Sequence, residues 1–516
     1  MALILGGFHA LGYAPYDLWY VSLFTLVGLF LIFSYIKSNK QLASIVFCFC
    51  LANNFVSLFW ISKVLNNFGQ MPMPLVIICL FAFGIYLALL PTFCTYFISR
   101  IFYKENTLKL LVGIPIFWII AENINGFLFT GFPWNWLGYT QIDSELSNYA
   151  PIFGVLGVSY FTLLIASATA LAIKKFNFLY LSFAIAIYAI GAWLSTIEYT
   201  DNEKPIKVAL MQGNIPTETK WDPEQVIPTL ENYMGLLNDN LDASLVVWPE
   251  SAIPALENNL TGFISKLDED LSDQSIGLIT GVQYYNEKKN EFYNGIIGIG
   301  DISSNNKIHY EYGVSNRYYK HHLVPIGEFV PFESLLRTLG PIFNMPMSSF
   351  TRGNTHQPNI LIKNLNIASA ICYEIVFSDE MRNQIYYGTN MIITISNDGW
   401  FNYSNGPYQH LNIARMRAKE FSKPVLRATN NGITAVIDKK GNIQSQILQN
   451  IRATLRTEIA PSIGITPYAN FGNTFLWLGF ALLLLISIWN KIYRLLLITF
   501  SKIERNLFKK VSEILK

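Results

Sequence analysis

The sequence is poor in cysteine and in charge. Five of its 516 residues are cysteines, and only 14% are Asp, Glu, Lys or Arg. Four cysteines (Cys48, Cys50, Cys79 and Cys94) lie in long apolar runs, so Cys372 has no cysteine in the polar segment with which to form a disulfide. An unpaired cysteine placed after an apolar strand pattern is either a small hydrophobic core residue or a nucleophile.

Metal-ligand patterns and phosphate-binding loops are also missing. The six histidines show no i, i+4 pair and no spacing with cysteines or acidic residues of the kind that a zinc or calcium site requires. No glycine-rich phosphate loop is present. A net charge of only +2 gives no bulk attraction to nucleic acid. We therefore expect no metal, no cofactor and no nucleic-acid partner, and because nothing calls for a second chain we expect a monomer.

Apolar residues are abundant instead. They make up 52% of the chain, with a mean hydropathy of +0.31, which indicates a membrane protein. Seven segments reach the roughly 20 residues that a spanning helix needs: 18–36, 41–62, 72–99, 109–127, 149–173, 177–195 and 473–490. An eighth apolar segment, 2–13, is short and lacks the basic start of a signal peptide. We therefore predict seven to eight transmembrane helices.

Basic residues alternate between the loops of these segments. The basic loops should face the cytoplasm, which places the large polar segment on the opposite, extracytoplasmic side of the membrane and the C-terminus in the cytoplasm. The intervening short loops offer only Lys63. The basic loops carry Lys37 and Lys40, then Arg100, Lys104 and Lys109, then Lys174 and Lys175, then the tail after residue 490.

We predict four regions. They are an N-terminal transmembrane bundle (1–196), an extracytoplasmic catalytic domain (197–465), a C-terminal transmembrane helix (466–490) and a basic amphipathic tail (491–516). The tail is either a helix that lies on the anionic cytoplasmic leaflet or a solvated segment without a role.

The polar domain shows an α/β pattern. Five short runs rich in Val, Ile and Ala, at 207–211, 245–248, 276–280, 367–371 and 391–395, alternate with helical patterns. Their unbroken apolar character predicts strands that are covered on both faces. Ligands of such sheets collect beyond the carboxyl ends of the strands, where Glu250, Cys372 and the pair Asn397 and Asp398 follow directly.

A carboxylate and a thiol at one sheet edge provide a base and a nucleophile for attack on a carbonyl. Lys320 offers a cation that lowers a thiol pKa and stabilises an oxyanion. Each residue also has an ordinary structural role: Cys372 in packing, Glu250 as a helix cap, and Lys320 in a solvated basic patch.

Three strings decide between these roles. WPESAIP (248–254), YKHHLVPIGE (319–328) and ICYE (371–374) resemble, in chain order, the Glu, Lys and Cys motifs of the nitrilase, or carbon–nitrogen hydrolase, superfamily. With spans on both sides of the domain, the chain resembles the bacterial apolipoprotein N-acyltransferase family. Further strings that carry this resemblance are APYDLW (14–19), TGFPW (130–134), QGNIP (212–216), KWD (220–222) and SNDGWF (396–401).

The resemblance implies an α-β-β-α sandwich domain inserted into an all-α polytopic bundle, and a two-step reaction through a Cys thioester. Glu250 would act as general base, Cys372 as nucleophile and Lys320 as oxyanion stabiliser. A phospholipid would be the acyl donor, and the α-amino group of an S-diacylglyceryl cysteine of an apolipoprotein the acceptor. The family implies supporting roles for Trp221, Glu328, Tyr373 and Glu374.

Two other functions and one further segment complete the predictions. A membrane-anchored amidase or nitrilase would share the triad but gives no reason for the spans. A transporter or receptor predicts ionisable residues within the spans, where only Glu122 stands out. The apolar segment 328–350 is a separate feature of the polar domain. We expect it to be either a lid that faces the bilayer or part of the domain core.

Overall fold

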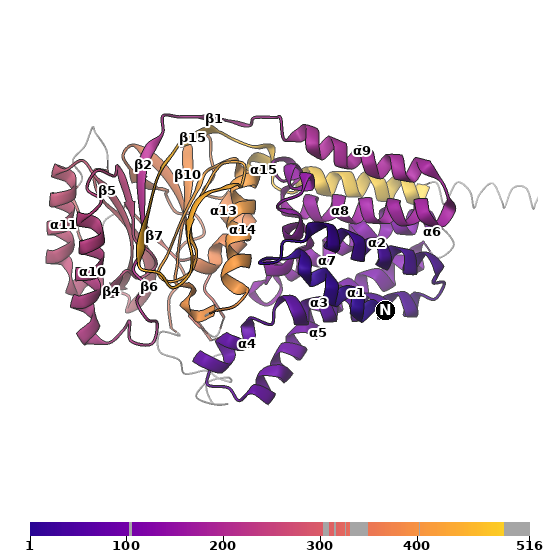
Figure 1. Ribbon diagram of the computed structural model, residues 1–516, viewed down its shortest axis with the longest axis horizontal. Coiled ribbons are helices and arrows are strands. Elements are labelled where there is room, and N and C mark those ends of the chain that lie inside the picture. Colours follow the sequence, from indigo (N-terminus) through magenta and orange to yellow (C-terminus); the bar gives the residue numbers. More distant parts are fainter. Residues whose placement is uncertain are drawn as a thin grey trace, which may run out of the picture.

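The structure is a computed structural model that describes residues 1–102, 106–302, 309–313, 316–325, 327–330, 349–401 and 403–489. Most of the predicted lid segment, 331–348, and the whole predicted tail, 491–516, lie outside the described residues. Figure 1 shows a helical region beside an α/β region, with strands from β1 (Thr200–Asn202) to β15 (Ser462–Gly464).

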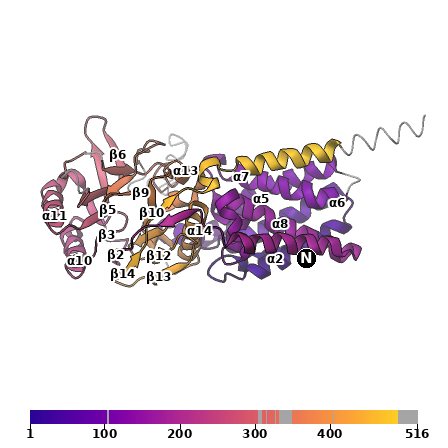
Figure 2. The ribbon, with the colours of Figure 1, turned by 90° about the horizontal axis from the view of Figure 1, so that it is seen from above.

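The helices of the first region run alongside one another, and the last helix, Thr474–Trp489, returns to lie among them (Figures 1 and 2). Within the described residues, Met73–Ile101, Asn106–Asn125 and Glu145–Lys175 are long and apolar enough to cross a membrane, and a fourth span results if the bent pair Asn39–Ser57 and Ile61–Phe68 is counted as one. The helices that match the predicted segments 2–13, 18–36, 177–195 and 473–490 are apolar but shorter. The total of seven to eight spans therefore stays a prediction.

One predicted span is bent. The sequence predicts a single helix over 41–62, whereas α3 (Asn39–Ser57) ends at Ser57 and the chain turns by 56° into Ile61–Phe68. The carbonyl of Ser57 accepts a hydrogen bond from Gln409 Nε2 at 3.0 Å, and Trp60 Nε1 donates to Gln409 Oε1 at 3.0 Å. The side chain of Gln409 thus satisfies the Ser57 carbonyl, a backbone acceptor that a straight helix would use itself.

Two sheets form the centre of the α/β region. The seven-stranded sheet has the order β14-β2-β3-β5-β6-β7, with β4 paired to β5, and the six-stranded sheet has the order β13-β12-β11-β10-β9-β8. The strands are β2 Ile206–Gln212, β3 Leu245–Val247, β4 Ile253–Leu256, β5 Gly277–Asn286, β6 Glu291–Gly300, β7 Arg317–Tyr319, β14 Ala453–Ile459, and β8 Ile360–Ile362, β9 Leu365–Ile371, β10 Thr389–Ser396, β11 Val425–Thr429, β12 Thr434–Ile437, β13 Ile443–Ile447.

The five predicted strands are confirmed as β2, β3, β5, β9 and β10. β2, β3 and β5 are parallel neighbours, as are β9, β10 and β11. Their apolar runs are continuous because both faces are covered. In β2, Val208 and Leu210 pack against the other sheet, and Ala209 and Met211 pack toward helices α10 (Val226–Asn238) and α11 (Thr261–Asp273).

Helix α14 (Gly406–Phe421) covers the outer face of the six-stranded sheet, between that sheet and the helical region (Figure 1). Its side chains contact both. Gln409 accepts a second hydrogen bond, from Trp134 Nε1 at 2.8 Å, and Arg417 Nη2 donates to Tyr139 Oη at 2.9 Å. The helix thereby fixes the α/β region on the helical region, close to the carboxyl ends of β9 and β10.

Candidate active site

Cys372 lies where β9 turns into the short helix η12 (Cys372–Val376). Its φ of 53° places it in the left-handed region, which is unfavourable for a residue with a Cβ atom and is seen where a structure holds a functional side chain in one direction. The thiol is buried. Cys372 is therefore a buried residue in a strained turn, an arrangement that simple packing does not require.

Glu250 follows β3, and its carboxylate is held by two donors. Asn294 Nδ2, from the middle of β6, donates to Oε1 at 2.7 Å, and the backbone N–H of Asn397 donates to Oε2 at 2.9 Å. Asn397 directly follows β10, as the sequence predicts. The carboxylate is thus fixed at the sheet edge by groups from two other strands.

Lys320 follows β7 and is almost completely buried. Its ammonium lies 3.8 Å from Glu250 Oε1 and donates to Glu328 Oε1 at 2.9 Å. Asn294 Nδ2 lies between the two carboxylates, also 3.2 Å from Glu328 Oε1. The predicted residues Glu250, Lys320 and Glu328 therefore form one buried polar cluster.

Burial and charge set the protonation of these groups. Burial, together with the Glu250 charge, raises the pKa of the Cys372 thiol to about 12, and Lys320 acts in the opposite sense. Burial also raises the pKa of Glu250, an effect that Lys320 reduces. Burial would lower the pKa of Lys320, but Glu328 and Glu250 hold it above its usual range. At neutral pH the thiol of Cys372 is therefore protonated and the amine of Lys320 is charged.

Glu374 holds the loop that carries Lys320. Its Oε1 accepts from Tyr318 Oη at 2.9 Å and from the backbone N–H groups of His321 and His322 at 2.6 and 3.0 Å, while Oε2 accepts from Ile371 N at 2.8 Å. Burial raises the pKa of Glu374 to about 7 despite these donors. The side chain joins the loop of Lys320 to the turn of Cys372.

Tyr373 and Trp221 lie at the margins of the cluster. Tyr373 Oη donates to the backbone carbonyl of Gly131 at 3.1 Å, and its ring stacks near Trp134, so it connects the nucleophile turn to the helical region. The Trp221 ring lies 5.8 Å from the ammonium of Lys220. Trp221 itself makes no contact with Glu250, Lys320 or Cys372 among the interactions seen in the described part of the chain.

Two residues of the site were missed by the sequence predictions. Lys220 Nζ donates to the backbone carbonyl of Glu250 at 2.9 Å, and burial lowers its pKa to about 8. It lies in the string KWD, so that motif was a usable signal. Asn294 lies within an antiparallel strand without any motif, and only the pairing of β6 with its neighbours brings it to Glu250.

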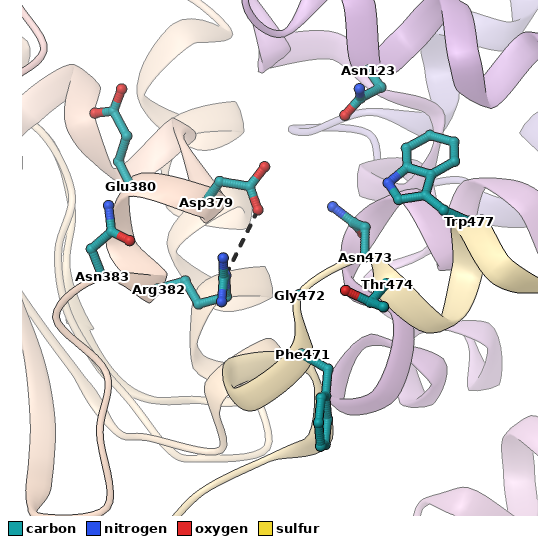
Figure 3. Close-up of a pocket in the computed structure, with 10 residues that line it drawn as sticks. All are labelled: Asn123, Asp379, Glu380, Arg382, Asn383, Phe471, Gly472, Asn473, Thr474 and Trp477. Carbon is teal, nitrogen blue, oxygen red and sulfur yellow. Dashed lines mark ion pairs between the residues drawn. The ribbon is translucent and has the colours of Figure 1, made fainter.

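No group of three or more His, Cys, Asp or Glu residues suited to a metal ion occurs among the described residues. An open cleft of about 500 Å³ lies between α13 (Ser378–Arg382) and the start of the last helix. Figure 3 shows Arg382 paired with Asp379 on one side, and Asn473 and Trp477 on the other. The cleft contains none of Glu250, Lys320 and Cys372, so we do not place the reaction there.

Residues 207–468, which include this cluster, match the carbon-nitrogen hydrolase family model, and residues 5–168 match the model of the apolipoprotein N-acyltransferase N-terminal domain. The α/β region thus has the carbon-nitrogen hydrolase fold. The chain is 39% identical to the apolipoprotein N-acyltransferase of Vibrio vulnificus over 95% of this chain and 96% of the relative, and 38% identical to that of Vibrio cholerae over 93% and 95%. A Shewanella oneidensis relative of the same name is 39% identical over 94% of each chain. The chain belongs to the apolipoprotein N-acyltransferase family.

Proposed function

We propose that this chain is an apolipoprotein N-acyltransferase that moves an acyl chain from a phospholipid to the N-terminal amino group of an S-diacylglyceryl cysteine. The observation that carries the proposal is the buried cluster of Glu250, Lys320 and Glu328, two of whose charges, those of Glu250 and Lys320, act on the pKa of the buried Cys372 thiol. The chain also matches this family over nearly its whole length. The product is a triacylated lipoprotein. The site holds a base, a cation and a nucleophile, which are the groups that acyl transfer through a covalent intermediate requires.

The first step forms a thioester. Glu250 takes the proton of the Cys372 thiol as sulfur attacks the ester carbonyl of the phospholipid, and the Lys320 ammonium stabilises the oxyanion. The carbon–oxygen bond to glycerol then breaks, and the glycerol oxygen receives the proton held by Glu250. A lysophospholipid leaves. Because the thiol has a pKa of about 12, it cannot ionise appreciably at neutral pH without this base.

The second step consumes the thioester. The α-amino group of the lipoprotein attacks the thioester carbonyl, Glu250 accepts a proton from the amine, and the same cation stabilises the second oxyanion. When the carbon–sulfur bond breaks, an amide is formed and the proton returns to sulfur. The donor product leaves before the acceptor reacts, so the mechanism is ping-pong.

The supporting residues act through the first three. Glu328 orients the Lys320 ammonium through its hydrogen bond at 2.9 Å, Glu374 positions the loop of Lys320, and Tyr373 anchors the nucleophile turn to the helical region. Trp221 is assigned to substrate binding on the basis of its place in the KWD string and its partial exposure.

The architecture suits substrates that lie in a bilayer. We infer seven or eight spanning helices, an α-β-β-α sandwich on the periplasmic side of the inner membrane, a cytoplasmic C-terminus, and the region borders 196, 465 and 490. Support comes from the alternation of basic loops and from large apolar side chains exposed on the outside of the helices, where lipid would cover them. Examples are Phe24, Ile78, Phe93, Phe97, Phe183, Trp193, Leu478 and Leu482.

Substitution Glu374→Gln should destabilise the protein. The amide has only one acceptor oxygen, so it leaves at least one of the N–H groups of Ile371, His321 and His322 facing another donor. We expect a loss of about 1–3 kcal/mol of unfolding free energy for one unsatisfied buried group. Thermal unfolding of the detergent-solubilised protein measures it, with Glu224→Gln at an exposed carboxylate as the control. An equal unfolding midpoint in both variants would contradict the role of Glu374.

Transfer and hydrolysis are separated by one experiment. Purified protein acylated with phospholipid is freed of excess lipid and mixed with a synthetic diacylglyceryl peptide, and the products are followed by mass spectrometry. We expect the acyl group to appear in an amide-linked peptide that resists hydroxylamine. Release of free fatty acid at the same rate with and without peptide would favour a membrane-anchored amidase and overturn the proposal.

A further inference from the structure

A second buried polar cluster lies directly behind the nucleophile. Asp398, His410 and Arg427 are almost completely buried. Arg427 Nη2 donates to Asp398 Oδ2 at 2.6 Å, and Ser396 Oγ donates to Asp398 Oδ1 at 2.6 Å. The reaction proposed above uses none of these groups. Ser396 and Asp398 lie at the end of β10, Arg427 lies within β11 and His410 lies on α14.

The cluster contacts the site through one hydrogen bond. His410 Nε2 lies 3.1 Å from the backbone carbonyl oxygen of Cys372. A carbonyl only accepts, so Nε2 must carry the proton. Arg427 Nη2, which only donates, lies 3.1 Å from His410 Nδ1, and Asp398 Oδ1, which only accepts, lies 3.3 Å from the same nitrogen. The carbonyl of Cys372 is the partner that fixes a proton on Nε2.

Burial and charge act on both His410 and Asp398. Burial and the neighbouring Arg427 lower the pKa of His410, although Asp398 opposes them. Burial would raise the pKa of Asp398, but Arg427 and His410 hold it below its usual range. Asp398 therefore stays ionised and pairs with Arg427.

We propose that His410 is a positioning residue for the nucleophile, which fixes the peptide between Cys372 and Tyr373 by donating to the Cys372 carbonyl. This peptide follows a residue with a φ of 53°, a conformation that persists only where its surroundings hold it. In a planar trans peptide the C=O and N–H groups point in opposite directions, so fixing the carbonyl also fixes the Tyr373 N–H. His410 thereby keeps the strained turn in its reactive arrangement.

This inference rests on the proposed thioester chemistry, and its test uses His410→Gln and His410→Met in the full-length protein. The two side chains have similar length, but only Gln carries an N–H donor. The measurement is the single-turnover rate of acyl-adduct formation on Cys372 over a range of phosphatidylethanolamine concentrations in mixed micelles. We expect Met to lower the maximal rate by about tenfold or more, with the half-saturating lipid concentration changed less than about threefold, because positioning affects the chemical step.

The Gln variant should recover most of the rate. A wild-type rate in His410→Met, or equal rates in Met and Gln, would overturn the inference. His9→Met is the matched control, because His9 is equally buried and bonded to Thr25 at 2.9 Å but lies in the helical region. If His9→Met slowed adduct formation as much as His410→Met, a general loss of buried hydrogen bonding would explain the effect. Failure of the wild type to form an adduct would count against the proposed function instead.

A measurement on the unchanged protein decides the case if His410→Met does not fold. Histidine ring nitrogens labelled with ¹⁵N report which nitrogen carries the proton. The His410→Gln variant lacks one pair of ring ¹⁵N signals, and the missing pair is thereby assigned to His410. We expect a proton on Nε2 between pH 6 and 8, as the hydrogen bond to the Cys372 carbonyl requires. A neutral ring with its proton on Nδ1 alone would show that His410 does not donate to the Cys372 carbonyl as proposed.

Discussion

Glu250→Gln is expected to lower the rate of Cys372 acylation by about 10²- to 10⁴-fold, the range that loss of a general base produces. The amide keeps the shape of the side chain and one acceptor oxygen, for either the Asn397 N–H or Asn294, but it cannot accept the thiol proton. The thiol, with a pKa of about 12, then stays protonated at neutral pH. Stopped reactions analysed by intact mass measure the rate.

The pH dependence of the wild type checks the same role. Glu250 must be ionised to act, and burial raises its pKa, so the acylation rate should rise with pH through an apparent pKa above the ordinary value for a glutamate. The Glu250→Gln variant should lack this rise. A variant that retains more than about one tenth of the wild-type rate, or the same acid limb in both proteins, would exclude Glu250 as the base.

Lys320→Met is expected to abolish acylation and to destabilise the fold. Removal of the cation takes away the oxyanion donor, an effect of about 10²- to 10³-fold on the rate. It also leaves Glu250 and Glu328 buried without the charge that pairs them, which costs about 3–5 kcal/mol when one partner of a buried pair is removed. Unfolding midpoints and single-turnover rates are measured on the same preparations.

A double variant separates these two effects. Lys320→Met with Glu328→Gln removes one of the two carboxylates and so restores part of the charge balance. We expect stability to recover in part and acylation to stay absent. Recovery of the rate together with stability would show that Lys320 serves only to neutralise the carboxylates.

The sequence was informative where a residue that takes part in the site directly follows a strand. Glu250, Cys372 and Asn397 lie at the ends of apolar runs, and parallel strands bring such ends to one edge, so their convergence could be predicted. Lys320 was found through its motif. Asn294 could not be found, because its approach to Glu250 depends on the register between β5, β6 and β7, which pairs residues distant in sequence.

Hydropathy predicted where helices lie better than how they end. The apolar run 41–62 predicts one span, but the helix bends after Ser57, where the carbonyl accepts a hydrogen bond from Gln409, more than 350 residues later. His410 escaped notice for the same reason: its partners Cys372 and Asp398 follow the ends of β9 and β10, and Arg427 lies in the middle of β11. Long-range polar contacts of this kind leave no periodic signal in the chain.

The most direct test of the account is the intact mass of the purified protein after incubation with a phospholipid of one defined acyl chain. We predict a mass increase equal to that acyl group, its removal by hydroxylamine, and its absence from Cys372→Ala under the same conditions. No adduct on the wild type, or an adduct that persists in Cys372→Ala, would contradict the thioester mechanism.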